Sequence, residues 1–206
     1  GVPFPEPKTG MEAAWNYDFR TRGDATQYRQ NGPVITPGSS IERKTLQERW
    51  ELFWIRRVDV EPKPAFSDNP KGIHWGMFMH MYEPAETKGS RFFNIRYIDA
   101  KSDDGYIYSA SFRRIRRVAV AQRTDVIDGS DIIYDDYYGW DGHIERNTYS
   151  LTGRKEMLVA RQSDPGDINR QTGQSIPDNV KRERLNTYVV EVVNKDPNYI
   201  YSKRIW

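Results

Sequence analysis

The side chains best suited to binding an anion lie near the middle of the chain. Arg113, Arg114, Arg116 and Arg117 surround Ile115 and follow an alternating run of aromatic and small residues. If the segment is a strand, Arg114 and Arg116 share one face and the other three residues share the opposite face. Guanidinium groups bind carboxylates and phosphates through paired hydrogen bonds. The run therefore predicts contact with an anionic headgroup, with an acidic partner or with carboxylates of the same chain.

An acidic stretch follows the arginine run. The segment from Arg91 to Arg123 has eight basic and three acidic residues, a balance of +5, whereas the segment from Thr124 to Glu145 has a balance of −7. Opposite charges this close in sequence favour pairing within the chain, and networks stabilise more than single exposed pairs. The predicted network comprises Arg113, Arg114, Arg116, Arg117, Asp131, Asp135, Asp136 and Asp141.

Residues for acid–base catalysis are few. His143 lies close to Asp141 and Glu145, so a hydrolase would use it with Asp135, Asp136 or Asp141. The chain has no Gly-x-Ser-x-Gly elbow, no phosphate-binding Walker loop and no cysteine, and its three histidines share no metal-binding spacing. We therefore expect a protein that is not an enzyme and that has no metal and no cofactor.

Apolar side chains gather in a second region. Met77, Met79 and Met81 alternate with other residues, so all three face one side of a strand. Methionine fills irregular cores and also lines adaptable apolar surfaces, and both interpretations stay open. The candidate lining of a ligand cavity comprises Trp50, Trp54, Met77, Met79, Met81, Phe93 and Tyr97.

Composition limits the class of protein. The chain has 206 residues and a net charge of +2, which argues against a general nucleic-acid binder. It lacks cysteine, and no stretch approaches the roughly 20 apolar residues of a membrane-spanning helix. The length favours one domain over residues 1–206.

The elements that position these residues are mostly strands. Thr9 and Glu12 form a capping-box pattern that predicts one helix, which Gly23 ends. Residues 39–53 also suit a helix, but the aromatic and β-branched residues near the end of this segment favour a strand. We predict an antiparallel sheet of about eight strands with one covering helix. The strand segments are 28–36, 41–58, 77–82, 92–97, 105–111, 114–120, 149–161, 185–194 and 199–206.

Several ordered stretches resemble one family. They are residues 1–5, 12–16, 112–117, 135–142, 151–157 and 188–192, with Lys203 and Arg204. Together they cover nearly the whole chain and resemble the outer-membrane lipoprotein-sorting protein family, domain of unknown function 1329. Tyr138 departs from this pattern, because the family has an acidic residue there. Members are usually longer at both ends, so the chain is expected to be truncated.

The resemblance implies a fold like the lipoprotein carriers LolA and LolB. That fold is a curved antiparallel sheet, an open half-barrel, with helices on its concave face. It also implies a periplasmic protein, near a membrane surface, that carries a hydrophobic ligand such as a lipid or acyl chain. The alternative is a non-catalytic interaction subunit that docks on an outer-membrane channel or envelope complex. The resemblance implies no catalytic residue.

Overall fold

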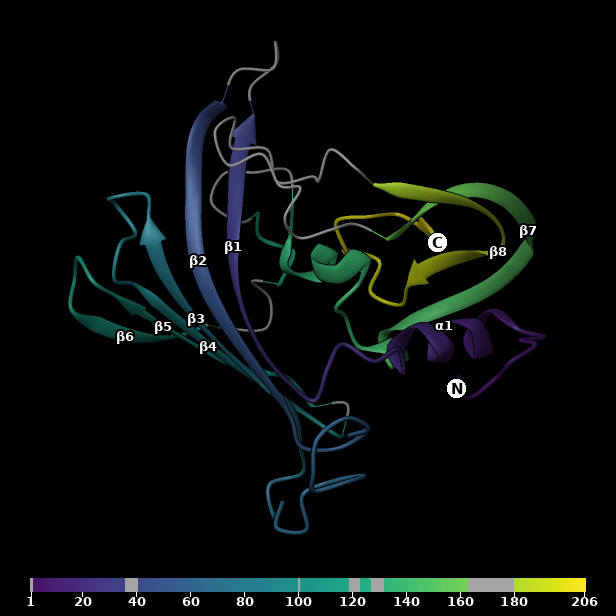
Figure 1. Ribbon diagram of the computed structural model, residues 1–206, viewed down its shortest axis with the longest axis horizontal. Coiled ribbons are helices and arrows are strands. Elements are labelled where there is room, and N and C mark those ends of the chain that lie inside the picture. The colour runs from purple at the N-terminus through teal and green to yellow at the C-terminus, as the bar shows by residue number, and fades with distance from the viewer. Residues whose placement is uncertain (1, 36–40, 100, 119–122, 127–131, 163–179) are drawn as a thin grey trace. The chain divides into compact units, whose positions relative to one another are not determined.

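The chain forms two compact units. A computed structural model describes residues 2–35, 41–99, 101–118, 123–126, 132–162 and 180–206 (Figure 1). Among these residues, 21–35, 41–99 and 101–118 make up the six-stranded unit. The helix-containing unit is made of residues 2–20, 123–126, 132–162 and 180–206.

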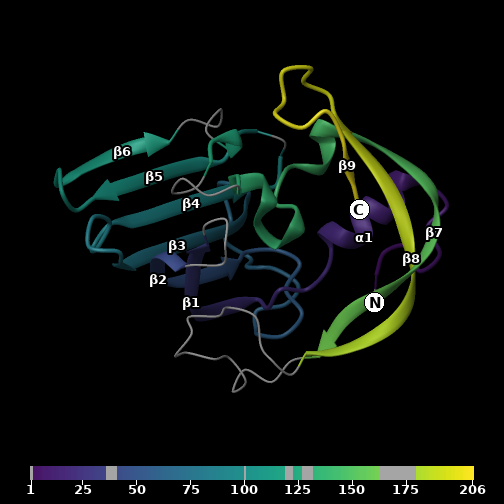
Figure 2. The same cartoon turned by 90° about the horizontal axis from the view of Figure 1, so that it is seen from above.

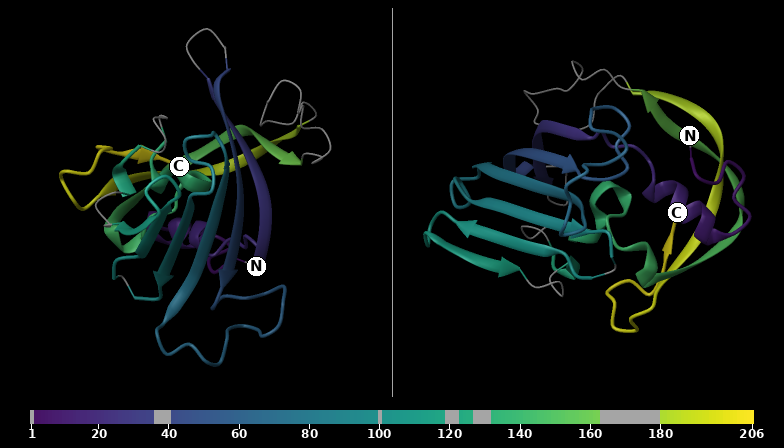
Figure 3. Two further views of the ribbon diagram at one scale, coloured as in Figure 1. Left: turned by 90° about the vertical axis from the view of Figure 1, so that its left-hand side faces the viewer. Right: turned by 90° about the horizontal axis from the view of Figure 1, so that it is seen from below.

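The six-stranded unit is an antiparallel meander. Each strand pairs with the next in chain order, as the side-by-side ribbons of Figure 3 illustrate. The turns are short at most junctions, as antiparallel neighbours require. The strands are β1 (Ala25–Ile35), β2 (Ile41–Phe53), β3 (Ile73–Glu83), β4 (Arg91–Tyr97), β5 (Asp104–Ser109) and β6 (Arg114–Val118).

The register divides this sheet into two different faces. Trp50 of β2 lies opposite Phe78 of β3, which lies opposite Phe93 of β4, and this row continues to Tyr106 of β5. The residues one position along the strands point to the other face. There the matching row is Glu51, Met77, Asn94 and Gly105. We call the first the aromatic face and the second the polar face.

The polar face is buried although it contains charges. Trp75, Met77 and Met81 supply its apolar core. Arg49 Nη2 lies 2.5 Å from Glu51 Oε1, and both side chains are buried. Across the sheet, Arg96 Nη2 lies 2.9 Å from Asp103 Oδ2, with the two side chains 7% and 4% exposed. Buried charges of this kind are tolerated because they are paired.

The helix-containing unit begins with α1 (Gly10–Asp18). Its N-terminus has the predicted capping box: Glu12 N donates to Thr9 Oγ1 over 3.2 Å, and Thr9 N donates to Glu12 Oε2 over 3.1 Å. The helix ends at Asp18, before Gly23. Two short 3-10 helices, η2 (Tyr134–Gly139) and η3 (Ile144–Arg146), precede the strands.

The strands of this unit form a second antiparallel sheet. It consists of β7 (Asn147–Gln162), β8 (Lys181–Asn194) and the short β9 (Arg204–Ile205). Figure 2 shows α1 on the inner side of the bent β7–β8 hairpin. The approach requires glycine at Gly10, because a Cβ there would lie 2.5 Å from the carbonyl carbon of Tyr149 in β7.

Aromatic rings fill the centre of the helix-containing unit. The Trp206 ring lies 5.3 Å from the ring of Tyr17 in α1, and 5.6 Å from the rings of both Trp140 and Tyr149. Backbone hydrogen bonds in both directions between Trp206 and Val190 fix the C-terminal residue beside β8. This core unites α1, η2, β7 and the end of the chain.

The predicted fold class is confirmed: the chain is mainly β, with open antiparallel sheets, a curved hairpin and few helices. The expectation of a single sheet is wrong, because the described strands form one sheet of six strands and a second sheet of three, β7, β8 and β9. The predicted strand 199–206 shortens to two residues. Residues 119 and 120 of the predicted strand 114–120 lie outside the described residues. A single domain over residues 1–206 stays a prediction.

Candidate functional site

The aromatic face of the six-stranded unit contains a groove of about 470 Å³. This volume lies within the range of small-molecule sites, roughly 300–1,000 Å³. The groove runs across the strands rather than along one of them. Its lining residues are Ala25, Thr26, Gln27, Trp50, Glu51, Leu52, Trp54, Gly76, Met77, Phe78 and Phe93.

A row of aromatic side chains forms one side of the groove and continues beyond it. The rings of Trp50 and Phe78 lie 5.5 Å apart, and Phe93 follows on the next strand. Phe93 is 39% exposed, and Tyr106 beyond it is 36% exposed. Exposed apolar side chains that adjoin one another mark binding surfaces more often than isolated ones do.

Gly76 keeps the groove open at its centre. A Cβ at this position would point to the aromatic face and lie 3.3 Å from the Trp54 ring. Any larger side chain would occupy the space between Trp54 and its neighbours. Because position 76 of β3 has no side chain, space remains in the groove beside the Trp54 ring.

Glu48 lies next to the groove, where it holds the lining residue Gln27. Gln27 Nε2 donates to Glu48 Oε1 over 2.9 Å, and the Tyr82 hydroxyl donates to Glu48 Oε2 over 2.8 Å. These hydrogen bonds lower the pKa of the Glu48 carboxyl below its ordinary value. The same contact raises the pKa of the Tyr82 hydroxyl. The carboxylate stays ionised, which keeps the surface next to the groove polar.

The other end of the aromatic row meets a second hydrogen-bonded carboxylate. The Tyr97 hydroxyl donates to Asp104 Oδ2 over 2.6 Å, and Arg117 forms an ion pair with Asp104 Oδ1. Asp104 raises the pKa of Tyr97 to about 12 through this hydrogen bond, and burial adds to the rise. Tyr97 and Arg117 together lower the pKa of Asp104. Both ends of the row are thus polar and internally paired, and the middle is apolar.

A buried network braces the corner where β1 and Trp54 meet. Asp24 accepts backbone hydrogen bonds from Val58, Asp59 and Val60 over 2.6–2.9 Å. The Arg57 guanidinium donates to backbone carbonyls, including that of Phe53 over 2.7 Å. Burial alone would raise the pKa of Asp24, but the three amides and Arg57 outweigh it and lower that pKa. The loop that carries Trp54 is fixed by these contacts.

The structure separates the residues that were expected to line one cavity. Trp50, Trp54 and Phe93 line the groove together. Met77 also borders it, from a strand position whose side chain belongs to the polar face. Met79 and Met81 lie on that same polar face, and Tyr97 contacts Asp104 instead.

Sequence reasoning missed the other residues of the groove. Phe78 is absent from the predicted lining, although its alternation with Met77 and Met79 places it on the face opposite to theirs. Leu52 shares the alternation of Trp50. Gly76 gave no sequence signal, because a strand glycine has several structural meanings.

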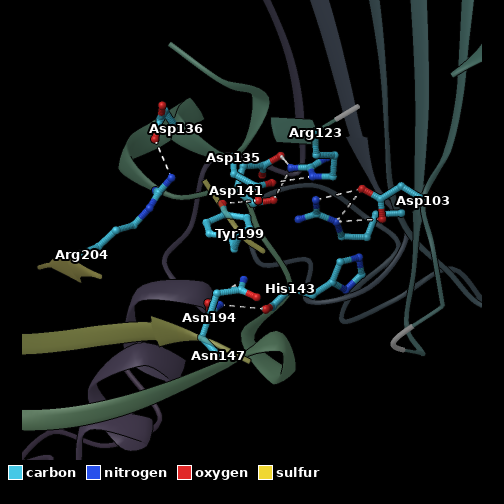
Figure 4. A network of polar contacts seen from close by, with 11 residues as sticks. Asp103, Arg123, Asp135, Asp136, Asp141, His143, Asn147, Asn194, Tyr199 and Arg204 are labelled. Atoms are coloured by element: carbon cyan, nitrogen blue, oxygen red, sulfur yellow. Dashed lines mark hydrogen bonds and ion pairs between the residues drawn. The ribbon is translucent and has the colours of Figure 1, made fainter. Parts of the chain in front are cut away.

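The predicted charge network has different partners from those expected. Arg123, not the arginine run, holds the aspartates: its Nε lies 2.6 Å from Asp135 Oδ1, and its Nη2 lies 3.2 Å from Asp141 Oδ2 (Figure 4). Asp136 pairs with Arg204 over 2.8 Å. Hydroxyls complete the arrangement, since Tyr199 donates to Asp135 and Tyr201 donates to Asp136.

The arginine run itself is exposed. Arg117 pairs with Asp104 of its own unit, whereas no carboxylate described in that unit pairs with Arg113, Arg114 or Arg116. Asp135 and Asp141 pair with Arg123, and Asp136 pairs with Arg204, all within the helix-containing unit. Pairing of these aspartates with the arginine run of the other unit stays a prediction. Asp131 lies outside the described residues.

The residues considered for hydrolysis are held in these same contacts. Asp135, Asp136 and Asp141 each accept from arginine, tyrosine or both, and the His143 carbonyl accepts from the Asn147 side-chain amide over 3.4 Å. Within the described residues, no group of three or more His, Asp or Glu side chains has the arrangement of a metal site. No helix among the described residues has the length and apolarity needed to cross a membrane.

Comparisons with known proteins agree on one family. The sequence model of the family described as "Protein of unknown function (DUF1329)" matches residues 1–206. None of the curated proteins matches the chain. The family match covers all the stretches on which the resemblance in sequence depends.

Two solved structures have a similar fold. A DUF1329 family protein from Desulfovibrio piger has a TM-score of 0.61 at 15% identity, over 95% of this chain and 65% of that one. A domain provisionally described as an outer membrane lipoprotein-sorting protein, from Vibrio parahaemolyticus, has a TM-score of 0.60 at 17% identity, over 95% and 64%. The chain thus spans less than two thirds of either relative, and identities this low establish the fold alone.

Proposed function

The chain belongs to the DUF1329 family, and we propose that it is a periplasmic carrier that binds a hydrophobic ligand, a lipid or acyl chain, in the groove of its six-stranded sheet. The observation that carries this proposal is the groove itself, which is apolar and open to solvent. A groove lined by Trp50, Trp54, Phe78 and Phe93 leaves apolar surface in water unless a ligand covers it.

The dimensions of the aromatic row suit an acyl chain. From Trp50 to Tyr106 the row crosses three strand spacings, roughly 14 Å at ~4.8 Å each. This is close to one leaflet of a bilayer, whose two leaflets form a hydrocarbon core about 30 Å thick. An extended acyl chain can therefore lie along the whole row. Each buried CH₂ contributes about 0.8 kcal/mol to its affinity.

Two further observations support a role in the envelope. The Vibrio parahaemolyticus relative is described as lipoprotein-sorting, which fits a periplasmic carrier of apolar cargo. In the described residues the titratable groups beside the groove are paired with one another, as at Glu48 and Asp104, so the site suits binding rather than catalysis. A channel or envelope complex that delivers or receives the ligand is the partner such a carrier requires.

Equilibrium binding of a fluorescent fatty acid tests the proposal. Phe92 and Phe93 are neighbours in β4 whose side chains point to opposite faces of the sheet. Phe93→Ser removes a groove side chain, and we expect it to weaken binding by about tenfold, the loss of roughly 1.4 kcal/mol of apolar contact. Phe92→Ser is the matched control and should leave the dissociation constant within about twofold.

Two results would contradict the proposal, one for the carrier function and one for the position of the ligand. Purified protein that takes up neither fatty acids nor phospholipids contradicts the carrier function. Equal weakening by Phe92→Ser and Phe93→Ser, with both variants folded by circular dichroism, places the ligand elsewhere than in the groove.

A further inference from the structure

The turn between β5 and β6 exposes two apolar side chains. Phe112 is 69% exposed and Ile115 is 71% exposed, more than any other large apolar side chain in the described residues. Phe112 lies in the turn, and Ile115 is the second residue of β6, which is an edge strand of the sheet. Both side chains are thus in water at the turn end of the β5–β6 hairpin, which we call the tip, and exposed apolar side chains gathered in one place are characteristic of an interaction surface.

Cations surround this tip. Arg113, Arg114 and Arg116 are exposed and have no carboxylate partner among the described residues of the six-stranded unit. The Arg116 guanidinium carbon lies 5.9 Å from the centre of the Phe112 ring, which keeps charge and ring together. Because β6 residues alternate, cations extend from both faces of the edge strand.

The adjoining β3–β4 turn changes this balance little. Ser111 Oγ contacts the Glu86 carbonyl oxygen over 3.5 Å, so the two turns lie side by side. That turn adds Glu83, Glu86 and Lys88, all exposed, and Asp104 already pairs with Arg117. The three carboxylates of Glu83, Glu86 and Asp104 thus face five cations, namely Lys88 and the four arginines of the run, so the local net charge is +2.

We propose that the β5–β6 turn docks on an anionic phospholipid surface. Arg113, Arg114 and Arg116 bind lipid phosphates, while Phe112 and Ile115 enter the boundary between headgroups and acyl chains. Charge complementarity selects an anionic surface, and exposed apolar side chains among the cations favour a lipid surface over an acidic protein. The proposal does not depend on the groove or its ligand.

Vesicle co-sedimentation tests this docking surface. Wild-type protein is mixed with phosphatidylcholine vesicles that contain increasing fractions of phosphatidylglycerol. A basic side chain near an anionic surface contributes about 1 kcal/mol, or roughly fivefold in partitioning. We expect Arg114→Ala/Arg116→Ala to lower partitioning by about 30-fold, and we expect high salt to abolish the difference.

Matched variants in the helix-containing unit serve as controls. Lys155→Ala/Arg182→Ala removes the same charge from exposed positions and should bind vesicles like the wild type. Phe112→Ser/Ile115→Ser should lower partitioning by at least tenfold, whereas Leu158→Ser/Ile200→Ser, at similarly exposed apolar positions, should not. All these side chains are exposed, so thermal melting should confirm intact folding in each variant.

Three outcomes overturn the proposal. The first is equal binding to vesicles with and without phosphatidylglycerol, and the second is equal binding by the tip variants and their controls. The third is absence of vesicle binding; arginine-dependent binding to envelope membranes that survives lipid extraction would then identify a protein partner. Each result leaves fatty-acid binding in the groove unaffected and so distinguishes the two proposals.

Discussion

The two faces of the six-stranded sheet reverse the usual distribution of residues. The polar face buries the ion pairs Arg49–Glu51 and Arg96–Asp103 beside methionines, whereas the aromatic face leaves Phe93 partly in water. A buried pair makes the fold sensitive to loss of either partner, because the other charge is then left uncompensated, whereas exposed apolar rings contribute little to folding. We therefore assign sensitivity of the fold to the polar face and ligand binding to the aromatic face.

The largest effect should come from breaking a buried pair on the polar face. Arg96→Ala leaves Asp103 buried without its guanidinium partner, which we expect to lower the free energy of unfolding by about 3–5 kcal/mol. Urea denaturation measures the loss. Arg117→Ala breaks a pair whose arginine is 71% exposed, so it should cost less than about 1 kcal/mol. Similar costs for the two variants would contradict the assignment of this sensitivity to the polar face.

A smaller and pH-dependent effect is expected at Asp24, which braces the corner beside Trp54. Asp24→Asn weakens the hydrogen bonds from Val58, Asp59 and Val60, at a cost of about 2 kcal/mol near pH 7. Folding lowers the pKa of Asp24, so its stabilisation is complete above the ordinary value of about 3.9 and disappears as pH falls through the lower folded value.

Denaturation curves from pH 7 down to pH 2 test the direction in which the stabilisation by Asp24 changes with pH. The gap between wild type and Asp24→Asn should be constant at neutral pH and should close only below about pH 4. A gap that closed on raising the pH would mean that the carboxylate does not act through its ionised form.

Filling the groove on the aromatic face should weaken ligand binding but change the stability of the fold little. Gly76→Val places a side chain against the Trp54 ring, 3.3 Å from where a Cβ would lie, and occupies the space meant for a ligand. We expect fatty-acid binding to weaken by at least tenfold while the free energy of unfolding changes by less than about 1.5 kcal/mol. Isothermal titration and urea denaturation on the same sample separate the two quantities. Unchanged affinity would exclude this groove.

The smallest expected effect comes from changing the length of the ligand by one CH₂ at a time. Each CH₂ that reaches the aromatic row should tighten binding by about 0.8 kcal/mol, or roughly fourfold. The gain should stop once the chain extends past the roughly 14 Å row. A homologous series of fatty acids measures this slope in the wild-type protein. A flat series would mean that the ligand is held by its headgroup, which the groove does not explain.

Local features of the fold could be predicted from the sequence. The capping box of Thr9 and Glu12 depends on four neighbouring residues, and the alternation of β2 and β3 depends on the period of two. The strand interpretation of residues 41–53 is confirmed, because neighbouring residues such as Arg49 and Trp50 point to opposite faces of the sheet. These signals are local, so one sequence suffices.

Long-range pairing could not be predicted. Nothing in the sequence of β7 indicates that it pairs with β8 rather than with β6, and this choice divides the chain into two sheets. The same limitation affected the charges. Proximity in sequence suggested the arginine run as the partner of Asp136, but Arg204 reaches it from 68 residues away. Likewise, Trp50 of β2 and Phe93 of β4 could be placed on the same face as Phe78 only once the register was known.

Quenching of tryptophan fluorescence by a brominated fatty acid shows which face of the six-stranded sheet holds the ligand. Trp50 and Trp54 line the groove, whereas Trp75 is buried on the polar face. Bromine quenches only nearby rings, so Trp50→Phe/Trp54→Phe should lose most of the quenching while Trp75→Phe keeps it. Quenching that persists in the double variant and disappears in Trp75→Phe would place the ligand on the polar face and contradict the account.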